Sequence, residues 1–462
     1  MTTPLKDIVE KVKDSRISPA SFAVLPDGAL AEMVYSPEEG RTYFAVWRDG
    51  IVSYEDRLTL TEWKSLRPYS PENTLIKNEI VLFPSRAEPY EAEQALVEEI
   101  QAFIHHYVDL GSLFEKLAAY YVLFSWLYDN FNELPYLRAK GDTGSGKTRF
   151  LLTVGSLCYK PAFASGASTV SPIFRILDLF RGTLVIDEGD FRFSDEKAEV
   201  IKILNNGNAR GFPVLRSEVV GRRGEFSPRA YQVYGPKLVG TRGAFQDRAL
   251  ESRCLTEELG NRKLRRDIPI NLPLEFKTEA RTLRNKLLWF RLANHGRVTV
   301  NPALVDEAIE PRLNQIFVPL LSVIHDAAAR SDLKQVLREY QRQLVADRGL
   351  EVEAQVAEVL HEVQDSADGG DLGLRDITSR FIEHHAEEMD RKVTPKWVGG
   401  IIRRRLGLRT ERRGGSYVIP ASEAPRLEQL YEKYGLRVEP DLPTSHGAAQ
   451  DIPRTSGLWE RE

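Results

Sequence analysis

The chain has 462 residues, of which 42% are hydrophobic and 28% charged, so it can bury a large core and should hold about three domains of roughly 150 residues each. Its net charge of −4 neither favours nor excludes nucleic acid, and its two cysteines, Cys158 and Cys254, are too far apart in sequence to suggest a disulfide framework or a zinc site. The N-terminus lacks a secretory signal, and the apolar stretch around 118–128 is too short to span a bilayer. We expect a cytoplasmic protein with no membrane partner.

The first third of the chain changes its hydrophobic period once. Short alternating runs separated by the turns PDG, PEEG and RDG predict a small β-rich domain over residues 1–88. From residue 89 apolar residues recur at helical spacing, which predicts a two-helix collar over 89–134. Residues 135–258 then alternate β-type and helical runs, the pattern of a parallel sheet covered by helices, and residues 259–366 are predicted to form a helical lid.

The stretch GDTGSGKT, residues 141–148, has the spacing G-x-x-x-x-G-K-[ST] between a short apolar run and a helical pattern. Glycines at 141, 144 and 146 let backbone amides turn toward phosphate oxygens. Lys147 would reach the β- and γ-phosphates, and Thr148 would offer its hydroxyl to Mg²⁺. The alternative is a chance glycine-rich turn. The predicted nucleotide-binding residues are Gly141, Asp142, Thr143, Gly144, Ser145, Gly146, Lys147, Thr148 and Arg149.

A second motif, TLVIDEGD at residues 183–190, is an apolar strand that ends in two adjacent carboxylates. A buried strand would deliver Asp187 to the sheet edge beside the glycine-rich loop, where it can hold Mg²⁺. Glu188 could then polarise the attacking water as a general base. An ordinary strand with a solvated acidic end is the alternative.

Residues 212–237 read as a hairpin whose tip carries Arg222 and Arg223, although an exposed charged turn would look the same. The strand that follows ends at Thr241, which could orient a water between the two motifs. Arg248 and Arg253 come next. Either could have a functional role, and the alternative for each is a surface arginine paired with Asp247 or Glu251.

The C-terminal part is basic, with nine Lys or Arg against the single acid Glu411 between residues 391 and 415. Thr394 can cap a helix whose apolar face is backed by arginines, and two short strands around a Gly-Gly turn follow. Residues 371–437 therefore resemble a winged-helix domain, a module that binds duplex DNA or, alternatively, docks proteins. The candidate DNA contacts are Lys396, Arg403, Arg404, Arg405, Arg412 and Arg413. The Pro-, Ser- and Gly-rich tail, 438–462, predicts disorder.

Over about residues 90–420 these motifs together resemble the AAA+ ATPases, and more narrowly the helicase-like ATPases of plasmids, prophages and integrated mobile elements, relatives of the superfamily III and minichromosome-maintenance-type helicases. The resemblance implies Walker A at Lys147 and Thr148, Walker B at Asp187 and Glu188, and sensor 1 at Thr241, a position that is usually Asn. It also implies an arginine finger at Arg253 or Arg248, and sensor 2 at Arg312, which begins an amphipathic helix placed to close over the nucleotide.

The resemblance further implies a homo-oligomeric ring, expected to be a hexamer, that uses ATP and Mg²⁺ to unwind or translocate along DNA during replication of a mobile element. Single-stranded DNA would lie in the channel against the Arg222/Arg223 hairpin, and duplex DNA at the winged helix. Two alternatives stay open: an AAA+ initiator or loader that does not unwind processively, and a nucleotide-gated DNA-binding switch.

Overall fold

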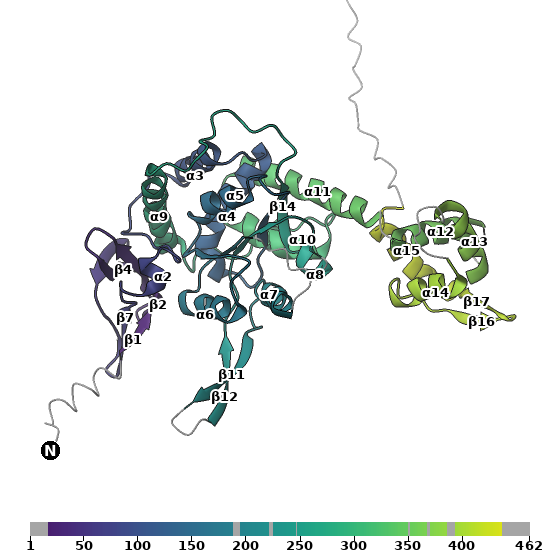
Figure 1. The fold of residues 1–462 in the computed structure, drawn as a ribbon, viewed down its shortest axis with the longest axis horizontal. Helices are drawn as coiled ribbons and strands as arrows, with labels where there is room; N and C mark the ends of the chain where they lie inside the picture. Colours follow the sequence, from purple (N-terminus) through teal and green to yellow (C-terminus); the bar gives the residue numbers. More distant parts are fainter. Residues whose placement is uncertain are drawn as a thin grey trace, which may run out of the picture. The chain divides into compact units, whose positions relative to one another are not determined.

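The computed structural model describes residues 17–187, 195–220, 225–245, 247–349, 352–366, 370–385 and 393–436. The chain divides into two compact units, residues 1–338 and 339–462, which we call the first and the second unit. Figure 1 labels their elements. None of the described helices has the length and apolar character needed to cross a membrane.

Residues 17–68 form two small sheets. One is antiparallel and consists of β2 (Phe22–Val24), β3 (Leu30–Ser36), β4 (Arg41–Arg48) and β5 (Ile51–Glu55). The other has the order β1 (Ile17–Ala20), β7 (Lys64–Pro68), β6 (Leu58–Thr61). The three predicted turns contain Gly28, Gly40 and Gly50, all with positive φ, where a glycine avoids the strain of a side chain. The short helix α2 (Thr74–Lys77) follows.

These strands share a core with the rest of the first unit. Phe44 and Val46 of β4 lie in one buried cluster with Ala162 and Phe180, which come from residues 135–258, the segment predicted to form the parallel sheet and its helices. Two helices then lead to the central sheet: α3 (Glu93–Tyr107), with one buried face, and α4 (Ser112–Leu127), which is buried almost all round. The 3₁₀ turn η1 (Tyr128–Asn130) closes α4.

The central sheet has five parallel strands in the order β14-β8-β13-β10-β9, which confirms the predicted mixed α/β fold with a parallel sheet. Its strands are β8 (Tyr136–Lys140), β9 (Ala162–Ala164), β10 (Leu184–Ile186), β13 (Lys237–Thr241) and β14 (Cys254–Glu258). The helices between them are α5 (Lys147–Gly155), α6 (Val170–Phe180), α7 (Asp195–Asn206) and α8 (Arg248–Glu251). Because the strands are parallel, the segments that follow β8, β10 and β13 meet at one edge.

A two-stranded hairpin leaves this sheet between α7 and β13. Its strands are β11 (Val214–Val220) and β12 (Glu225–Tyr231), paired antiparallel in register from Val214↔Tyr231 to Val220↔Glu225. Figure 1 shows the hairpin extending beyond α6 and α7. The predicted hairpin is therefore present, but its tip, with Arg222 and Arg223, lies outside the described residues.

The helices after the sheet are α9 (Glu275–Asn294), α10 (Pro311–Ser322) and α11 (Ala327–Gly349), with the 3₁₀ turn η2 (Pro302–Leu304) between the first two. Arg291 of α9 is fully buried and pairs with Asp129, at 2.7 Å, and with Glu32 of β3, at 2.6 Å. Lys160 is also buried and lies 2.8 Å from Glu32. This buried charge cluster joins β3 of the N-terminal antiparallel sheet to η1, to helix α9 and to the segment that follows α5.

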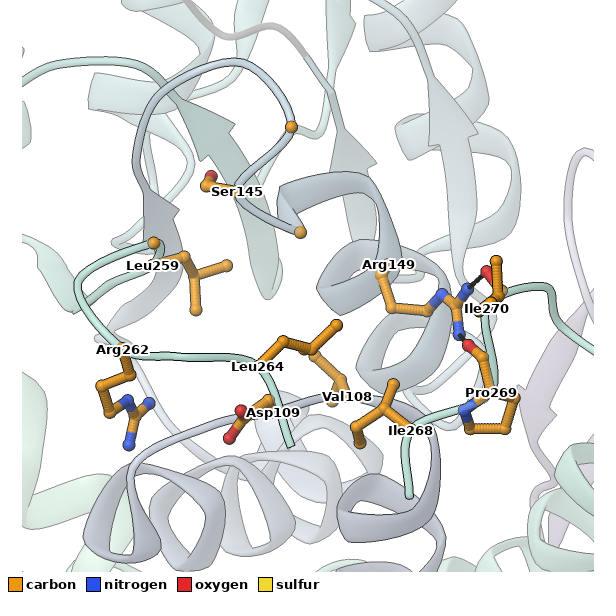
Figure 2. Close-up of a pocket in the computed structure, with 13 residues that line it drawn as sticks. Val108, Asp109, Ser145, Arg149, Leu259, Arg262, Leu264, Ile268, Pro269 and Ile270 are labelled. Carbon is orange, nitrogen blue, oxygen red and sulfur yellow. Dashed lines mark hydrogen bonds between the residues drawn. The ribbon is translucent and has the colours of Figure 1, made fainter. Parts of the chain in front are cut away.

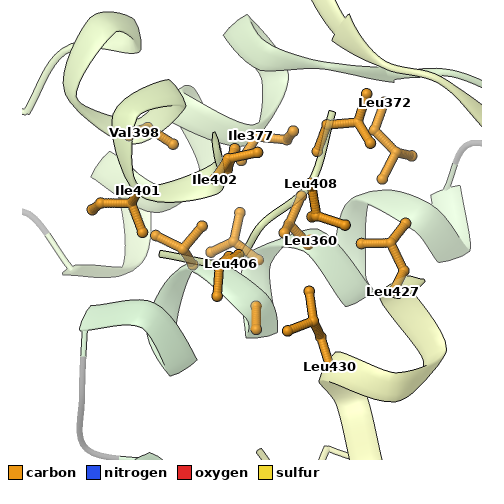
Figure 3. Close-up of a cluster of buried hydrophobic side chains, with 14 of the residues drawn as sticks. Leu360, Leu372, Ile377, Val398, Ile401, Ile402, Leu406, Leu408, Leu427 and Leu430 are labelled. Carbon is orange, nitrogen blue, oxygen red and sulfur yellow. The ribbon is translucent and has the colours of Figure 1, made fainter. Parts of the chain in front are cut away.

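The second unit contains α12 (Val352–Ser366), β15 (Leu372–Gly373), α13 (Leu374–His385), α14 (Pro395–Arg404), β16 (Glu411–Arg413), β17 (Ser416–Ile419), the 3₁₀ turn η4 (Ala421–Glu423) and α15 (Ala424–Lys433). Its three short strands pair antiparallel in the order β15-β17-β16. Thr394 caps α14, accepting from the backbone N–H of Trp397 at 3.3 Å. Figure 3 shows the core, in which Leu360 of α12 packs with Leu372, Ile402 and Leu427. Helix α12 thus belongs to this core, although its residues fall within the predicted lid, 259–366.

Candidate nucleotide-binding site

The glycine-rich loop joins β8, an interior strand of the sheet, to helix α5. Gly144 and Gly146 have φ values of 82° and 101°, a region that side chains with a Cβ rarely adopt. A Cβ at Gly141 would lie 2.5 Å from the carbonyl oxygen of Leu259, a distance that no real contact tolerates. All three glycines are therefore needed for the conformation that carries the loop to the start of α5.

Lys147 and Thr148 are the first two residues of α5, and their side chains contact the glycine-rich loop and Asp187. Lys147 Nζ donates to the carbonyl oxygens of Gly141, at 2.7 Å, and Asp142, at 2.6 Å, so the ammonium is folded back over the loop. Thr148 Oγ1 donates to Asp187 Oδ2 at 2.6 Å. The two motifs predicted from the sequence are thus in direct contact across 39 residues of chain.

Asp187 directly follows β10 and lies beside β13. A Cβ on Gly240 would come within 3.1 Å of Asp187 Oδ1 and 3.6 Å of the Lys147 side chain, so a glycine here leaves room for both groups. Thr241, the next residue, is buried, and its hydroxyl has no hydrogen-bond partner among the described residues. Ser145 Oγ in the loop is buried and unpartnered in the same sense. Two unsatisfied hydroxyls are expensive to bury without a ligand or water.

These side chains fit a magnesium nucleotide. Mg²⁺ prefers oxygen ligands and is usually held by one or two carboxylates together with phosphates and water, rather than by a complete protein cage. Among the described residues there is no cluster of three or more His, Cys, Asp or Glu that could form such a cage. The Thr148 hydroxyl and the Asp187 carboxylate could supply the few protein ligands that Mg²⁺ needs beside phosphate and water. Lys147 and the backbone amides of the loop could bind the negatively charged phosphates.

A cavity of about 470 Å³ adjoins the loop and was not predicted from the sequence. Figure 2 shows Val108 and Asp109, from the turn between α3 and α4, facing Leu259, Leu264 and Ile268 from the segment after β14. Its volume and mostly apolar lining are typical of a small-molecule site. No sequence motif indicates this cavity. Its lining comes from the α3–α4 turn, the glycine-rich loop and the segment after β14, which come together only because β14 pairs with β8.

Arg149, predicted to bind nucleotide, holds the wall of this cavity. Its guanidinium donates to the carbonyl oxygens of Pro269, at 2.9 Å, and Ile270, at 2.6 Å (Figure 2). Asp109 accepts from the backbone N–H of Arg265 at 3.0 Å, which ties the same segment to the α3–α4 turn. The segment 259–270 is therefore fastened on both sides of the cavity.

Arg253 and Arg312 lie together at the other edge of the sheet. The carbonyl oxygen of Arg253 accepts from Tyr136 N, at the start of β8, at 2.8 Å, whereas the loop follows the end of this five-residue strand, roughly 13 Å away. Gln315, on the same helix as Arg312, donates to Glu133, just before β8, at 3.3 Å, which places this helix near the start of that strand. Burial lowers the pKa of Arg253, and the charge of Arg312 lowers it further. Arg312 is thus not brought to the loop of its own chain, in contrast to the expectation that it closes over the nucleotide.

Neither arginine is neutralised by a carboxylate within 4 Å in the described part of the chain. Arg253 donates to the side-chain oxygens of Asn208, at 2.8 Å, and Asn205, at 2.5 Å, which are neutral acceptors. Arg312 Nε is buried and has no described hydrogen-bond partner. The side chains of Arg248 and Glu188 lie outside the described set.

The hairpin has two unlike faces. On one face Leu215, Val219 and Phe226 lie with Ser217, Pro228 and Ala230, and the side chains of Leu215, Val219 and Phe226 are 65%, 63% and 77% exposed. The other face carries charged groups, and there Arg175 of α6 pairs with Glu218 at 2.5 Å. The arginines of the tip could be predicted from the sequence, whereas this apolar face was missed, although the alternation of apolar and polar residues along the two strands indicates it.

Among the predicted DNA contacts of the second unit, two arginines are engaged by acids. Arg405 pairs with Glu353 at 3.1 Å, and Arg413 pairs with Asp371 and Glu411 at 2.5 and 3.0 Å. Arg403 donates to Thr410 at 3.1 Å and lies over the ring of Tyr417. The exposed candidates with no described ion-pair partner are Lys396, Arg403, Arg404 and Arg412.

Comparison with known sequences finds no matching protein-family profile and no matching curated protein. Comparison with solved structures finds similar chains at low identity. A C-terminal region of NrS-1 is 10% identical, with a TM-score of 0.37 over 84% of this chain and 96% of that one. The active helicase Cch of SCCmec type IV is 11% identical, with a TM-score of 0.42 over 92% and 84% of the two chains. A minichromosome-maintenance homologue from Methanopyrus kandleri is 12% identical, with a TM-score of 0.35 over 68% and 74%.

Proposed function

We propose that this protein is an ATP-dependent DNA helicase or translocase of the AAA+ class. The observation that carries the proposal is the contact between Thr148 and Asp187 beside Lys147, inside a loop that requires glycine at three positions. A glycine-rich loop at the end of an interior parallel strand, β8, with a carboxylate at the end of β10, on the other side of β13, is the arrangement that binds nucleoside triphosphates in P-loop enzymes.

Each residue has a distinct role in this proposal. Lys147 exchanges its two carbonyl acceptors for phosphate oxygens, and Thr148 and Asp187 hold Mg²⁺, which neutralises phosphate charge when bound. Glu188, directly after Asp187, accepts a proton from the attacking water, and Thr241 orients that water. The nucleobase occupies the 470 Å³ cavity beside Gly144, with Asp109 at its edge.

The two arginines support action between subunits. Arg253 and Arg312 carry charge that no described carboxylate within 4 Å balances, and they lie across the sheet from their own loop. A guanidinium at that edge lies away from its own loop and can instead contact a nucleotide bound by another copy, and arginines supplied to a γ-phosphate in this way accelerate hydrolysis by about 10³ to 10⁵. We propose a ring, with six subunits as the expected number, in which each copy completes its neighbour's site.

DNA is assigned to two places. The hairpin offers an exposed phenylalanine together with the paired arginines of its tip, which suits a single strand inside a channel. The second unit, proposed to be a winged helix, offers Arg403 and Arg412 beside the exposed Tyr417, together with the exposed Arg404, which suits the phosphates of a duplex. Replication of a mobile element remains the proposed setting.

Two assays separate the alternatives. ATP turnover that rises with single-stranded DNA is expected of an engine, whereas a nucleotide-gated switch would turn over at the same rate with and without DNA. Displacement of a labelled strand from a forked duplex is expected of a helicase, whereas an initiator or loader would bind the fork and leave it paired.

A further inference from the structure

A second cavity, of about 340 Å³, lies in the first unit away from the nucleotide site. It is enclosed by the end of β3, the segment after α2, the far end of α5, β9 and α9, and its apolar lining includes Ile76, Val81, Phe83, Leu152, Phe163 and Phe276. Ser156 lines it at the C-terminal end of α5. Because a helix rises 1.5 Å per residue, this end is roughly 13 Å from Lys147.

Arg284 brings a buried positive charge to this apolar cavity. Its residue is only 6% exposed, and its guanidinium donates to the carbonyl oxygens of Ser156, at 2.8 Å, and Phe83, at 3.4 Å. No carboxylate among the described residues lies within ion-pair distance of it. Burial and, to a smaller extent, the charge of Arg281 lower the pKa of Arg284 to about 10, and the more distant carboxylate of Glu79 opposes them only in part; the group stays protonated at neutral pH. A buried charge paired only with neutral acceptors is costly unless an anion approaches it.

The remaining charges around the cavity do not supply that anion. Of the other charged residues that line it, Lys277 pairs with Glu79, and Arg281 pairs at 2.9 Å with Glu38, which lies outside the lining, so each already has a partner. The lining residues taken together with Glu38 thus carry one excess positive charge, that of Arg284, in a lining that includes three phenylalanine rings. Its volume is at the small end of the range for ligand sites, about 300 to 1,000 Å³.

We propose that this cavity binds a small amphipathic anion, with its carboxylate or phosphate head on Arg284 and its apolar body against Phe83, Phe163 and Phe276. A guanidinium can receive either kind of oxyanion through two parallel hydrogen bonds, which makes the head group the shared element of recognition. The site is independent of the proposed nucleotide site, because it shares only helix α5 with it.

The test is calorimetric titration of the whole protein with four probes of equal chain length: octanoate, octyl phosphate, octanol and octylamine. Octanoate or octyl phosphate should bind at one site per chain, and octanol and octylamine at least tenfold more weakly. The stronger of the two anions identifies the head group. Equal binding of anion and alcohol, or no binding of either anion at millimolar concentration, would overturn the proposal.

Two variants locate the binding. Arg284→Met should weaken the anion at least tenfold and leave octanol unchanged, whereas Arg284→Lys should keep most of the affinity. Ala280, which is buried in the lining, gives a variant that leaves the charge in place: Ala280→Leu fills the cavity and should abolish anion binding, with retained ATP turnover as evidence of folding. Unchanged anion affinity in Ala280→Leu would contradict the assignment even if Arg284→Met failed to fold.

Discussion

The hydroxyl of Thr148 makes the most specific contact in the proposed nucleotide site, because it joins the glycine-rich loop to Asp187 at 2.6 Å. Thr148→Ser keeps the hydroxyl, and Thr148→Val keeps the shape without it. The Val variant should lose the Mg²⁺-dependent part of ATP affinity, by about tenfold or more, since a hydrogen bond to a charged group contributes roughly 1.5 to 3 kcal/mol. A fluorescent ATP analogue titrated with and without Mg²⁺ measures this.

The Ser variant is the control and should bind within about threefold of the wild type. If Val and Ser variants responded to Mg²⁺ alike, the hydroxyl would not be a ligand and the role of the pair would be structural.

The site residues that could be predicted from the sequence are those that lie next to one another in the chain. Gly141 to Thr148 form the loop by themselves, so their spacing sufficed. Asp109 and Leu264 were missed because their common cavity depends on the pairing of β14 with β8. The location of Arg312 was missed for a related reason: an amphipathic helix predicts its buried face but not the edge of the sheet on which it rests.

The buried charge cluster of Glu32, Asp129, Lys160 and Arg291 should make the stability of the first unit depend on pH. Burial alone would raise the pKa of Glu32, but the charges of Lys160 and Arg291 outweigh it and hold the pKa below its ordinary value; the pKa of Asp129 is lowered in the same way, chiefly by Arg291. A carboxylate with a lowered folded pKa stabilises the fold fully above its unfolded pKa, near 4, and loses that contribution as the pH falls through the folded pKa.

Glu32→Gln should therefore lower the free energy of unfolding by about 3 to 5 kcal/mol at pH 7, since it leaves Lys160 without its carboxylate partner and Arg291 with one fewer. Urea unfolding at several pH values measures the loss, and the difference from the wild type should shrink below about pH 4. Glu38→Gln, which breaks an exposed pair with Arg281, is the matched control and should cost less than about 1 kcal/mol. Equal costs for the two variants would remove any special role of the cluster.

The hairpin should bind a single strand partly through its apolar face. Phe226→Ala should weaken single-stranded DNA binding by about 1 to 3 kcal/mol, the range for one stacked base, without changing the salt dependence. Replacing Arg222 and Arg223 should instead lower the salt slope by about 1.4, using roughly 0.7 per phosphate contact. Fluorescence anisotropy at several salt concentrations distinguishes the two.

Phe212, also exposed but before β11, supplies the control: Phe212→Ala should bind like the wild type. A Phe226 variant that bound DNA normally but failed to assemble would assign the apolar face to a neighbouring subunit instead.

At the scale of elements, the period of the sequence predicted the strands and helices well, because half-buried strands and amphipathic helices leave a local pattern. The grouping of elements was harder. Helix α12 has an apolar face that would suit a lid or the C-terminal core equally, and the structure places Leu360 in the core of the second unit. The N-terminal strands likewise look independent in sequence, yet their core includes Phe180.

For the molecule as a whole, the position of Arg253 predicts that one active site is built from two chains. Arg253→Ala and Lys147→Ala should each be inactive alone, and mixing them should restore part of the ATP turnover. In mixed assemblies some interfaces pair an intact loop with an intact arginine. ATP turnover plotted against the mixing ratio should pass through a maximum. Arg312→Ala should give the same result as Arg253→Ala when it is mixed with Lys147→Ala.

A mixture that stayed inactive at every ratio would argue that each chain acts alone or that Arg253 is not the shared residue. Exchange between subunits is checked independently by energy transfer between two labelled populations, so that an inactive mixture cannot be ascribed to separate rings.

If ATP hydrolysis at the Lys147 site separates DNA strands, this can be measured as the rate at which a labelled strand leaves a forked duplex. The wild type with ATP and Mg²⁺ should displace the strand, whereas Lys147→Ala should bind the fork through its unchanged second unit and release nothing. A non-hydrolysable ATP analogue should likewise give binding without displacement. Strand release by Lys147→Ala at the wild-type rate, or a wild type that hydrolyses ATP on the fork and leaves it fully paired, would contradict the account.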